Sequence, residues 1–221
     1  MRENAPLKSG DPARLGGYEL RARLGEGGQG VVYLGVSPSG RPVAIKWLRS
    51  DLAEDPVMRE RFLREVASAQ RVAAFCTAQI IETGIEQDRP YIVSEYIDGP
   101  SLQQLVARQG PLSGSALQRL AIGTATALAA IHRAGIVHRD FKPANVLMGP
   151  DGPRVIDFGI AKALDAAATL SSRPIGTPSY MAPEQLTGTV VGPPADLFAW
   201  AGTIVYAATG DAPFGSDSVP A

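Results

Sequence analysis

The stretch with the densest set of polar and charged residue types is His-Arg-Asp-Phe-Lys-Pro-Ala-Asn, at residues 138–145. It places five polar or charged residue types in eight positions, directly after an apolar segment. Such a density of polar groups in an apolar frame is costly to bury, so it indicates a functional site. An Asp-Phe-Gly sequence begins further on at Asp157, and Asn145 and Asp157 are oxygen donors from two different segments. A hard divalent ion such as Mg²⁺ needs donors of this kind beside phosphate oxygens, so the stretch predicts a site for a metal-bound phosphate.

A second motif lies near the start of the chain, where Gly25, Gly27 and Gly30 fit the pattern G-x-G-x-x-G-x-V that ends at Val32. This spacing is weak evidence by itself, because it also occurs in dinucleotide-binding folds and in ordinary turns. Here the glycines separate two predicted antiparallel strands rather than a strand and a helix. That context favours a flap over nucleotide phosphates, whose oxygens backbone amides can approach closely at glycine.

Lys46 is the next candidate, at the end of Val-Ala-Ile-Lys on the strand that follows the flap. Strand alternation puts Ala44 and Lys46 on one face, beneath the glycines. The alternative is an ordinary exposed lysine, but only four of the 21 basic residues are lysine, which favours a specific use of the ammonium group. A lysine directed at phosphate needs a counter-ion, and Glu65 on the following helix is placed to provide it. A solvated position at the helix edge is an equally good interpretation of Glu65.

Strands and one helix are expected to carry these motifs in the first part of the chain. The strands alternate apolar and polar residues, as a sheet with one buried face requires. The helix has Met58, Phe62 and Val66 on one face at helical spacing, with Pro56 in its first turn. The predicted strands are 18–24, 31–36, 42–48, 79–84 and 90–96, and the predicted helix is 55–73.

Asp-Gly-Pro at residues 98–100 marks a break, after which the pattern becomes mainly helical. The last predicted helix is apolar on all sides, which predicts burial on all sides. At the other end of the chain, residues 1–17 are polar and rich in proline and glycine, and we expect a disordered leader there. After the break the predicted helices are 101–109, 113–134 and 196–209, the short strands are 146–148 and 154–156, and a long loop runs from 157 to about 183.

Composition excludes several classes of protein. A net charge of −1 argues against nucleic-acid binding through bulk positive charge, and a hydrophobic fraction of 45% excludes a disordered chain. No apolar run reaches the roughly 18 residues needed to span a bilayer. The single cysteine, Cys76, can form no internal disulfide or zinc cluster. We therefore expect a reduced, cytoplasmic chain in which Cys76 is buried as a small apolar residue.

The last motif closes the long loop with Gly-Thr-Pro-Ser-Tyr-Met-Ala-Pro-Glu at 176–184, preceded by a hydroxyl cluster of Thr169, Ser171 and Ser172. With all these motifs in order from residue 18 to about residue 215, the sequence resembles a eukaryotic-type (Hanks-type) serine/threonine protein kinase. Its Arg- and Ala-rich composition favours a bacterial member. The resemblance implies an α+β fold of two lobes. These are a five-stranded antiparallel N-lobe with one main helix over 18–97, and a mainly helical C-lobe over 98–221 that lacks its last helices.

The resemblance also implies a task for each motif. Asp140 would accept or orient the proton of a Ser or Thr hydroxyl, with support from Thr177. Lys142 would contact the γ-phosphate of ATP, while Lys46, oriented by Glu65, would hold the α- and β-phosphates. ATP and Mg²⁺ (or Mn²⁺) are the implied cofactors, and proteins are the implied substrates. The implied ATP-binding residues are Gly25, Gly27, Gly30, Val32, Ala44, Lys46, Glu95, Ile97 and Leu147, the metal ligands are Asn145 and Asp157, and the structural anchors are Arg139, Glu184 and Asp196.

Two of these groups have more specific implied roles. Val32, Ala44 and Leu147 would enclose the adenine, and the backbone from Glu95 to Ile97 would meet its edge as a hinge. Arg139, directly before the catalytic aspartate, implies control by loop phosphorylation, because a phosphate on the hydroxyl cluster would pair with it.

The sequence departs from the family pattern in two places. Residues 73–78 stand where such kinases often have a His-Pro turn after the helix. The sequence also stops soon after the central apolar helix, before the helices that would cover it and before the arginine that would pair with Glu184. Trp200, Ile204 and Tyr206 are therefore expected to lack part of their cover, which predicts a homodimer or domain exchange.

An alternative function follows from the same departure. The chain could be a nucleotide-binding regulatory or scaffold module that is inactive because its C-lobe is incomplete. If the native chain is longer, it could also be the cytoplasmic part of a membrane-anchored kinase.

Overall fold

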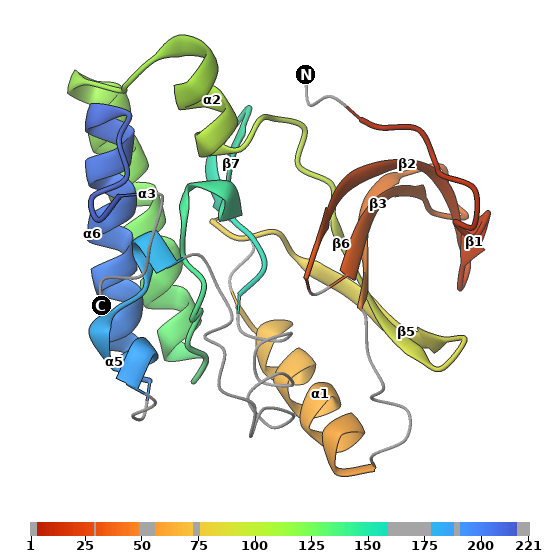
Figure 1. Cartoon of the computed structure of the whole chain (residues 1–221). Coiled ribbons are helices and arrows are strands. Elements are labelled where there is room, and N and C mark those ends of the chain that lie inside the picture. The colour runs from red at the N-terminus through yellow and green to blue at the C-terminus, as the bar shows by residue number, and fades with distance from the viewer. Residues whose placement is uncertain are drawn as a thin grey trace.

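The alternating residues in the first part of the chain fold into one antiparallel sheet (Figure 1). Its strands neighbour one another in the order β1-β2-β3-β4-β6-β5. The computed structural model describes residues 4–28, 30–48, 56–72, 76–158, 178–187 and 191–215. The strands are β1 (Arg14–Leu15), β2 (Tyr18–Gly27), β3 (Gly30–Val36), β4 (Pro42–Leu48), β5 (Ile80–Glu86) and β6 (Arg89–Glu95).

The register of β3 and β4 gives the sheet two unlike faces. Tyr33 and Ile45 are cross-strand partners and are almost fully buried, in a core that also holds Trp47. Val32 and Lys46 form the neighbouring pair, and their side chains are half-buried on the opposite face. Since Lys46 forms an ion pair with Asp157 of the C-terminal half, this second face is turned toward that half.

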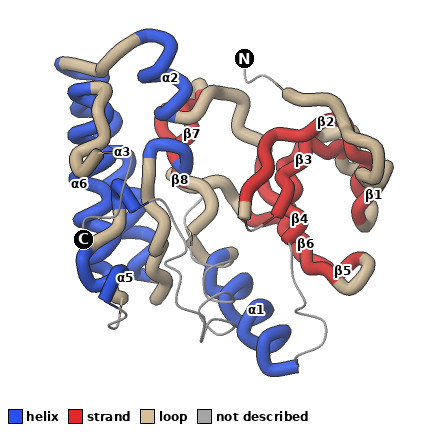
Figure 2. Tube along the Cα trace, in the orientation of Figure 1, coloured by secondary structure: helices blue, strands red, loops and turns tan. Residues whose placement is uncertain are grey.

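Helix α1 (Pro56–Ala69) packs through the face that the sequence pattern predicts. Phe62, Val66 and Ala69 are buried. They belong to a cluster that also contains Leu48 at the end of β4 and Phe158 from the C-terminal half. The helix lies between the sheet and the C-terminal helices (Figures 1 and 2).

Two long helices, α3 (Gly114–Arg133) and α6 (Pro193–Thr209), lie side by side in the C-terminal half (Figures 1 and 2). They are joined by a hydrogen bond of 2.9 Å from Trp200 Nε1 to Thr124 Oγ1. Helix α2 (Leu102–Gln109) begins with a capping box, in which the Ser101 and Gln104 side chains each bond the other residue's backbone amide. The shorter elements are η1 (Pro143–Asn145), β7 (Val146–Gly149), β8 (Gly152–Val155), η2 (Pro178–Tyr180) and α5 (Pro183–Thr187).

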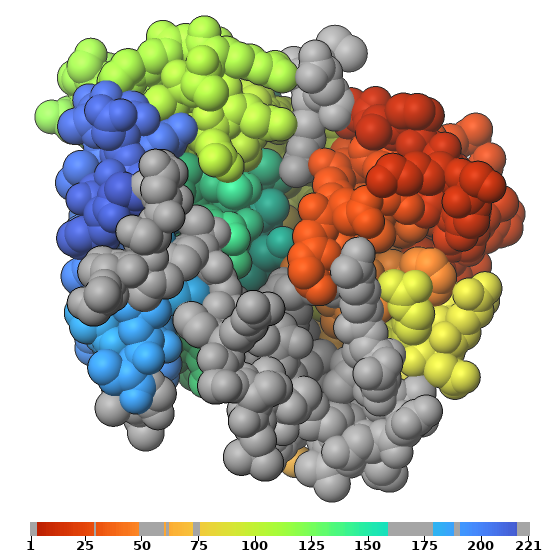
Figure 3. Space-filling view, viewed as in Figure 1, coloured from red at the N-terminus to blue at the C-terminus, as the bar shows by residue number. Residues whose placement is uncertain are grey.

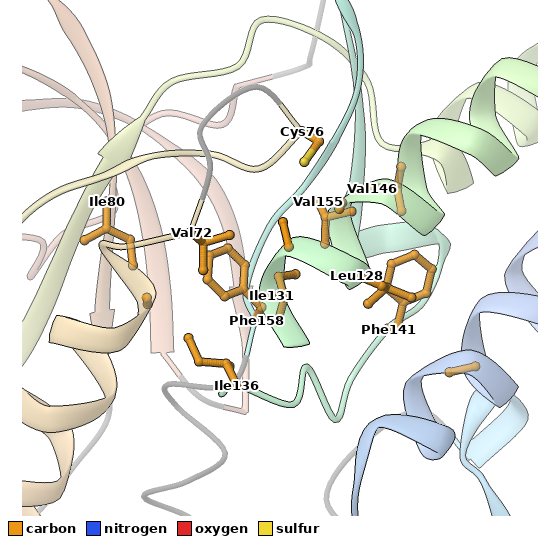
Figure 4. Close-up of a cluster of buried hydrophobic side chains, with 14 of the residues drawn as sticks. Val72, Cys76, Ile80, Leu128, Ile131, Ile136, Phe141, Val146, Val155 and Phe158 are labelled. Carbon is orange, nitrogen blue, oxygen red and sulfur yellow. The ribbon is translucent and has the colours of Figure 1, made fainter. Parts of the chain in front are cut away.

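One apolar cluster connects the two halves (Figure 4). Phe158 is 5% exposed, and it lies beside Val72 from the N-terminal half and Ile131 of α3. Cys76 belongs to the same cluster and is 3% exposed, which confirms its predicted burial. The Val155 amide donates to the Cys76 carbonyl at 2.9 Å, so the strand before Asp157 is also bonded to the N-terminal half through its backbone. The cluster therefore holds the Asp157 segment against both halves.

The predicted disordered leader is wrong for residues 4–17. β1 pairs with β2, and Leu15 at the end of β1 is completely buried. The sheet therefore has six strands rather than the five predicted. A polar composition indicated disorder, but the segment is ordered by contacts with residues distant in the sequence, among them an ion pair from Asp11 to Arg23.

The apolar helix α6 also differs from its prediction. It begins at Pro193, three residues earlier than predicted, and it is not buried on all sides: Leu197 is 53% exposed and Val205 is 45% exposed. Trp200, Ile204 and Tyr206 are partly buried against the core, as the expectation of incomplete cover requires. Within the described ranges, no helix is both long and apolar enough to cross a membrane.

Candidate active site

Asp196, in the first turn of α6, is the anchor of the stretch at 138–145. Its side chain is 1% exposed. Its two carboxylate oxygens accept hydrogen bonds from the backbone amides of His138 at 2.7 Å and Arg139 at 2.8 Å. Arg139 has a positive φ of 62°, which a non-glycine residue rarely adopts, and the bonded carboxylate holds the backbone in that turn. The buried carboxylate of Asp196 thus fixes the backbone directly before Asp140.

His138 supports the same turn from inside the core. It is fully buried, and its Nε2 lies 3.1 Å from the Ile156 carbonyl while its Nδ1 lies 3.3 Å from the Asp140 amide. The amide can only donate and the carbonyl can only accept, so the ring is neutral with its proton on Nε2. Burial lowers the pKa of His138, which keeps this form at neutral pH. The ring therefore links the segment before Asp140 to the segment before Asp157.

Asp140 lies among groups that can act on a hydroxyl and a phosphate. Lys142 Nζ is 3.0 Å from Asp140 Oδ2. The Asn145 side-chain amide donates to the Asp140 carbonyl at 2.8 Å and lies 3.3 Å from Asp140 Oδ2. Both neighbours contact the same carboxylate oxygen, Oδ2, and orient the side chain. An anion placed here would meet the ammonium group of Lys142, and a hydroxyl would meet the carboxylate.

Asp157 brings the N-terminal half to this site. Its φ of 59° turns the chain sharply between Ile156 and the buried ring of Phe158. Lys46 Nζ lies 3.2 Å from Asp157 Oδ1. The predicted counter-ion of Lys46 was Glu65; in the described part of the chain, the ion pair shown for Lys46 is with Asp157 and not with Glu65. The Glu65 side chain is half-buried on α1, at the edge of the helix face that packs inward.

The glycine-rich segment forms the hairpin between β2 and β3, with Gly25 opposite Val32 and Gly27 opposite Gly30. Gly30 has a φ of +146°, and a Cβ added there would lie 2.1 Å from the Trp47 carbonyl oxygen. No other residue type fits this position without movement of the backbone. A Cβ at Gly25 would meet nothing within 4 Å. Gly30 therefore lets the flap lie directly against the strand that carries Lys46.

Two glycine variants test the role of Gly30. Gly30→Ala is expected to displace the flap and to weaken nucleotide binding about tenfold or more, since a displaced backbone loses several amide contacts at once. Gly17→Ala, outside the flap, where a Cβ would lie 3.7 Å from the Pro38 side chain, is expected to change nucleotide affinity by less than about threefold. Titration calorimetry with Mg²⁺ and ATP would measure both, and equal effects of the two variants would contradict this account of the flap.

The residues expected around adenine come from both halves. Val32 and Ala44 are half-buried on the same face of the sheet as Lys46. Leu147 of β7 and Ile97 after β6 are buried together in a small apolar cluster. Glu95 ends β6 directly before the connecting segment. In Figure 3 the residues of β7 and β8 are recessed between the sheet and α2, which is consistent with a binding site between the two halves.

The donor set fits the divalent ion that the sequence predicts. Asn145 and Asp157 contribute an amide oxygen and a carboxylate, the hard donors that Mg²⁺ prefers. The Asn145 nitrogen is directed at Asp140, which leaves its oxygen on the other side of the amide. No group of three or more histidine, cysteine or acidic side chains in the described ranges could hold a metal by itself. The remaining ligands would therefore be phosphate oxygens and water.

Several predicted site residues lie outside the described residues: Thr169, Ser171, Ser172 and Thr177. Glu184 lies in the first turn of α5. Glu184 also has an interaction partner in the structure. The neighbouring Gln185 donates from its side chain to the Arg139 carbonyl at 2.9 Å, so α5 also supports the turn before Asp140.

Sequence reasoning missed two residues at this site. His132 Nε2 lies 2.7 Å from Asp196 Oδ2 and ties α3 to the anchor. Gln185 was not singled out either. His132 is one of two histidines in the chain, which was the available signal, but nothing local to it indicates a partner in α6.

Comparisons with known proteins agree with this geometry. The family model described as Protein kinase domain matches residues 18–220. The probable serine/threonine-protein kinase PkwA of Thermomonospora curvata is 50% identical over 215 residues, which make up 97% of this chain and 29% of PkwA. The serine/threonine-protein kinase AfsK of Streptomyces griseus is 47% identical, over 94% of this chain and 26% of AfsK. The chain thus spans less than a third of these curated relatives.

The fold is also similar to that of a solved protein kinase domain. The crystal structure of the Mycobacterium tuberculosis PknI kinase domain superposes with a TM-score of 0.74 at 30% sequence identity, and the match covers 97% of this chain and 82% of that one. The resemblance identified from the motifs is therefore confirmed, as is the two-part fold with an antiparallel sheet and a helical half. This chain belongs to the protein kinase family, among relatives that are bacterial serine/threonine kinases.

Proposed function

We propose that this chain is an ATP-dependent serine/threonine protein kinase domain, which transfers the γ-phosphate of ATP to Ser or Thr hydroxyls of proteins. The observation that carries the proposal is a set of contacts between the two halves of the chain. Lys46 lies 3.2 Å from Asp157, and Asp140 contacts both Lys142 and Asn145. In this proposal residues 18–97 form the ATP-binding lobe and residues 98–221 form the catalytic lobe.

The residues divide the chemistry among them. Asp140 accepts the proton of the substrate hydroxyl. The oxygen of that hydroxyl bonds to the γ-phosphorus, and the bond from the γ-phosphorus to the bridging oxygen of ADP breaks. Lys142, 3.0 Å from Asp140, offsets charge on the transferred phosphoryl group. Lys46 holds the α- and β-phosphates, and Glu65 would orient it once Asp157 engages the metal. Bound at Asn145 and Asp157, Mg²⁺ or Mn²⁺ would neutralise phosphate charge.

Binding and control use the surrounding residues. The flap of Gly25, Gly27 and Gly30 would cover the phosphates. Adenine would lie between the two apolar walls, against the backbone of Glu95 and Ile97. Thr177 would support Asp140. Phosphate added to the loop hydroxyls would pair with Arg139, which ties regulation to the turn that Asp196 holds. The loop hydroxyls in question are Thr169, Ser171 and Ser172.

Transfer of labelled phosphate tests this function against the alternative of an inactive nucleotide-binding module. The purified chain would be incubated with Mg²⁺, γ-labelled ATP and a generic basic protein, and ATP affinity would be measured in parallel. Label on serine or threonine of the acceptor is expected. Measurable ATP binding with no transfer to the acceptor or to the chain itself would favour the regulatory or scaffold module.

The exposed face of α6 motivates a proposal about assembly. Leu197, Ala201, Val205 and Ala208 are exposed at helical spacing, and an apolar stripe of this kind is rarely left in water. We propose that a second copy of the chain covers this stripe, by dimerisation or domain exchange. We also propose that the chain is cytoplasmic, either as a whole protein or as the cytoplasmic part of a membrane-anchored protein. Light scattering should then show a dimer, and a monomer at high concentration would contradict this.

A further inference from the structure

An N-terminal strap, residues 4–13, lies along the outer edge of β2 (Figure 1). The Ala5 amide donates to the Arg23 carbonyl at 3.0 Å, and the Arg23 amide donates back to the Ala5 carbonyl at 2.8 Å. The Leu20 amide donates to the Ala13 carbonyl at 2.9 Å. The pairing of β2 with β3 is irregular on both sides of Arg23. The strap therefore supports β2 where its regular ladder is interrupted.

Asp11 is the centre of this support. Its side chain is 4% exposed, and both of its oxygens accept hydrogen bonds from the Arg23 guanidinium, in a fork geometry. Asp11 Oδ1 also accepts from the Tyr33 hydroxyl at 2.7 Å, and Oδ2 accepts from the Lys8 amide at 2.7 Å. Since Arg23 belongs to β2 and Tyr33 to β3, one buried carboxylate joins both strands of the flap hairpin. The hydrogen bond from Arg23 holds the pKa of Asp11 well below its usual range, so the group is charged at neutral pH.

The network continues into the flap itself. Arg23 Nη1 donates to Glu26 Oε2 at 2.7 Å, and Lys8 Nζ donates to the same oxygen at 2.9 Å. Glu26 lies between Gly25 and Gly27, two of the three flap glycines expected to cover phosphates. A Cβ on either glycine would meet nothing within 4 Å, so the flap lies open there. Its position must therefore be set largely from its base and through Glu26.

We propose that Asp11 is a positioning residue for ATP binding: it fastens the N-terminal strap across both strands of the flap hairpin and holds the glycine-rich backbone where the phosphates bind. This inference rests on the proposed function, in which the flap covers ATP. Asp11 touches no reacting atom. Its effect reaches the phosphates through Arg23, Tyr33 and Glu26.

The test compares Asp11→Asn with Asp88→Asn, the same chemical change at an exposed residue in the β5–β6 turn. Asp88 has a positive φ of 58°, which asparagine tolerates. Hydrogen exchange would be measured for the amides of residues 24–28. The dissociation constant would be measured for a non-hydrolysable ATP analogue with Mg²⁺. Asp11→Asn is expected to speed flap exchange about tenfold and to weaken analogue binding about fivefold, as loss of one charge-assisted pair predicts. Asp88→Asn should change neither.

The outcomes separate this inference from the proposed function. Unchanged flap exchange, or faster exchange with unchanged analogue affinity, would overturn the positioning role of Asp11. Failure of the wild-type chain to bind the analogue would instead contradict the proposed function, while flap exchange would still report on the strap. If Asp11→Asn does not fold, Tyr33→Phe removes one hydrogen bond to the carboxylate and keeps the ring. It should shift both readouts in the same direction, by about twofold.

Discussion

Replacing Asp140 with asparagine is expected to lower the rate of phosphate transfer about a thousandfold. The amide cannot accept the hydroxyl proton, and a positioned acid or base typically contributes 10²–10⁴ in rate. The substitution keeps the size of the side chain, and Asp140 is bonded to Lys142 and Asn145 rather than to the flap. ATP affinity should therefore change by less than about threefold. The catalytic constant and the nucleotide dissociation constant would be measured separately.

A control variant shows whether the loss belongs to the site. Asp151→Asn makes the same change in the turn between β7 and β8, where the side chain is 82% exposed. It is expected to keep full activity. If Asp140→Asn retained more than about a tenth of the wild-type rate, Asp140 would not be the base that the geometry indicates.

Asp196→Ala is expected to lower the free energy of unfolding by about 3–5 kcal/mol, the usual range for breaking a buried charged network. The substitution leaves the His138 and Arg139 amides without an acceptor in the interior, and each such orphan costs about 1–3 kcal/mol. It also removes the partner of His132, 2.7 Å away. Because domains are stable by only about 5–15 kcal/mol, this loss would remove a large part of the stability.

Urea unfolding at neutral pH would measure this loss. Asp196→Asn keeps one oxygen acceptor and should fall between the wild type and the alanine variant. A loss of less than about 1 kcal/mol in Asp196→Ala would show that the turn at Arg139 is held by other contacts.

The local parts of the fold were predictable from the sequence. The strand at 42–48 was predicted with the bounds that β4 has, because residues 43–47 alternate between buried and half-buried. The face of α1 was predictable for a similar reason, since Phe62 and Val66 recur at helical spacing and are both buried. The stretch at 138–145 stands out by composition, because buried polar groups need a task, and its role as a catalytic site stays a prediction.

Contacts between distant segments were not predictable in the same way. Composition alone indicated disorder for residues 4–17, whereas Asp11 finds Arg23 and Tyr33 in the folded sheet. Spacing placed Glu65 near Lys46, but the pair present in the structure joins Lys46 to Asp157, whose position depends on burial of Phe158 beside it. The apolar composition of α6 predicted complete burial. Burial depends on which other elements pack against the helix, and Leu197 and Val205 stay exposed.

The most direct test of phosphate transfer through Asp140 is intact-mass spectrometry of the purified chain after incubation with Mg²⁺ and ATP, followed by mapping of the modified residues. The account predicts added phosphate on serine or threonine in the wild type, with Thr169, Ser171 and Ser172 as the expected positions. It predicts about a thousandfold slower addition in Asp140→Asn under conditions where both proteins bind ATP. Phosphate added equally to both proteins, or to neither, would contradict it.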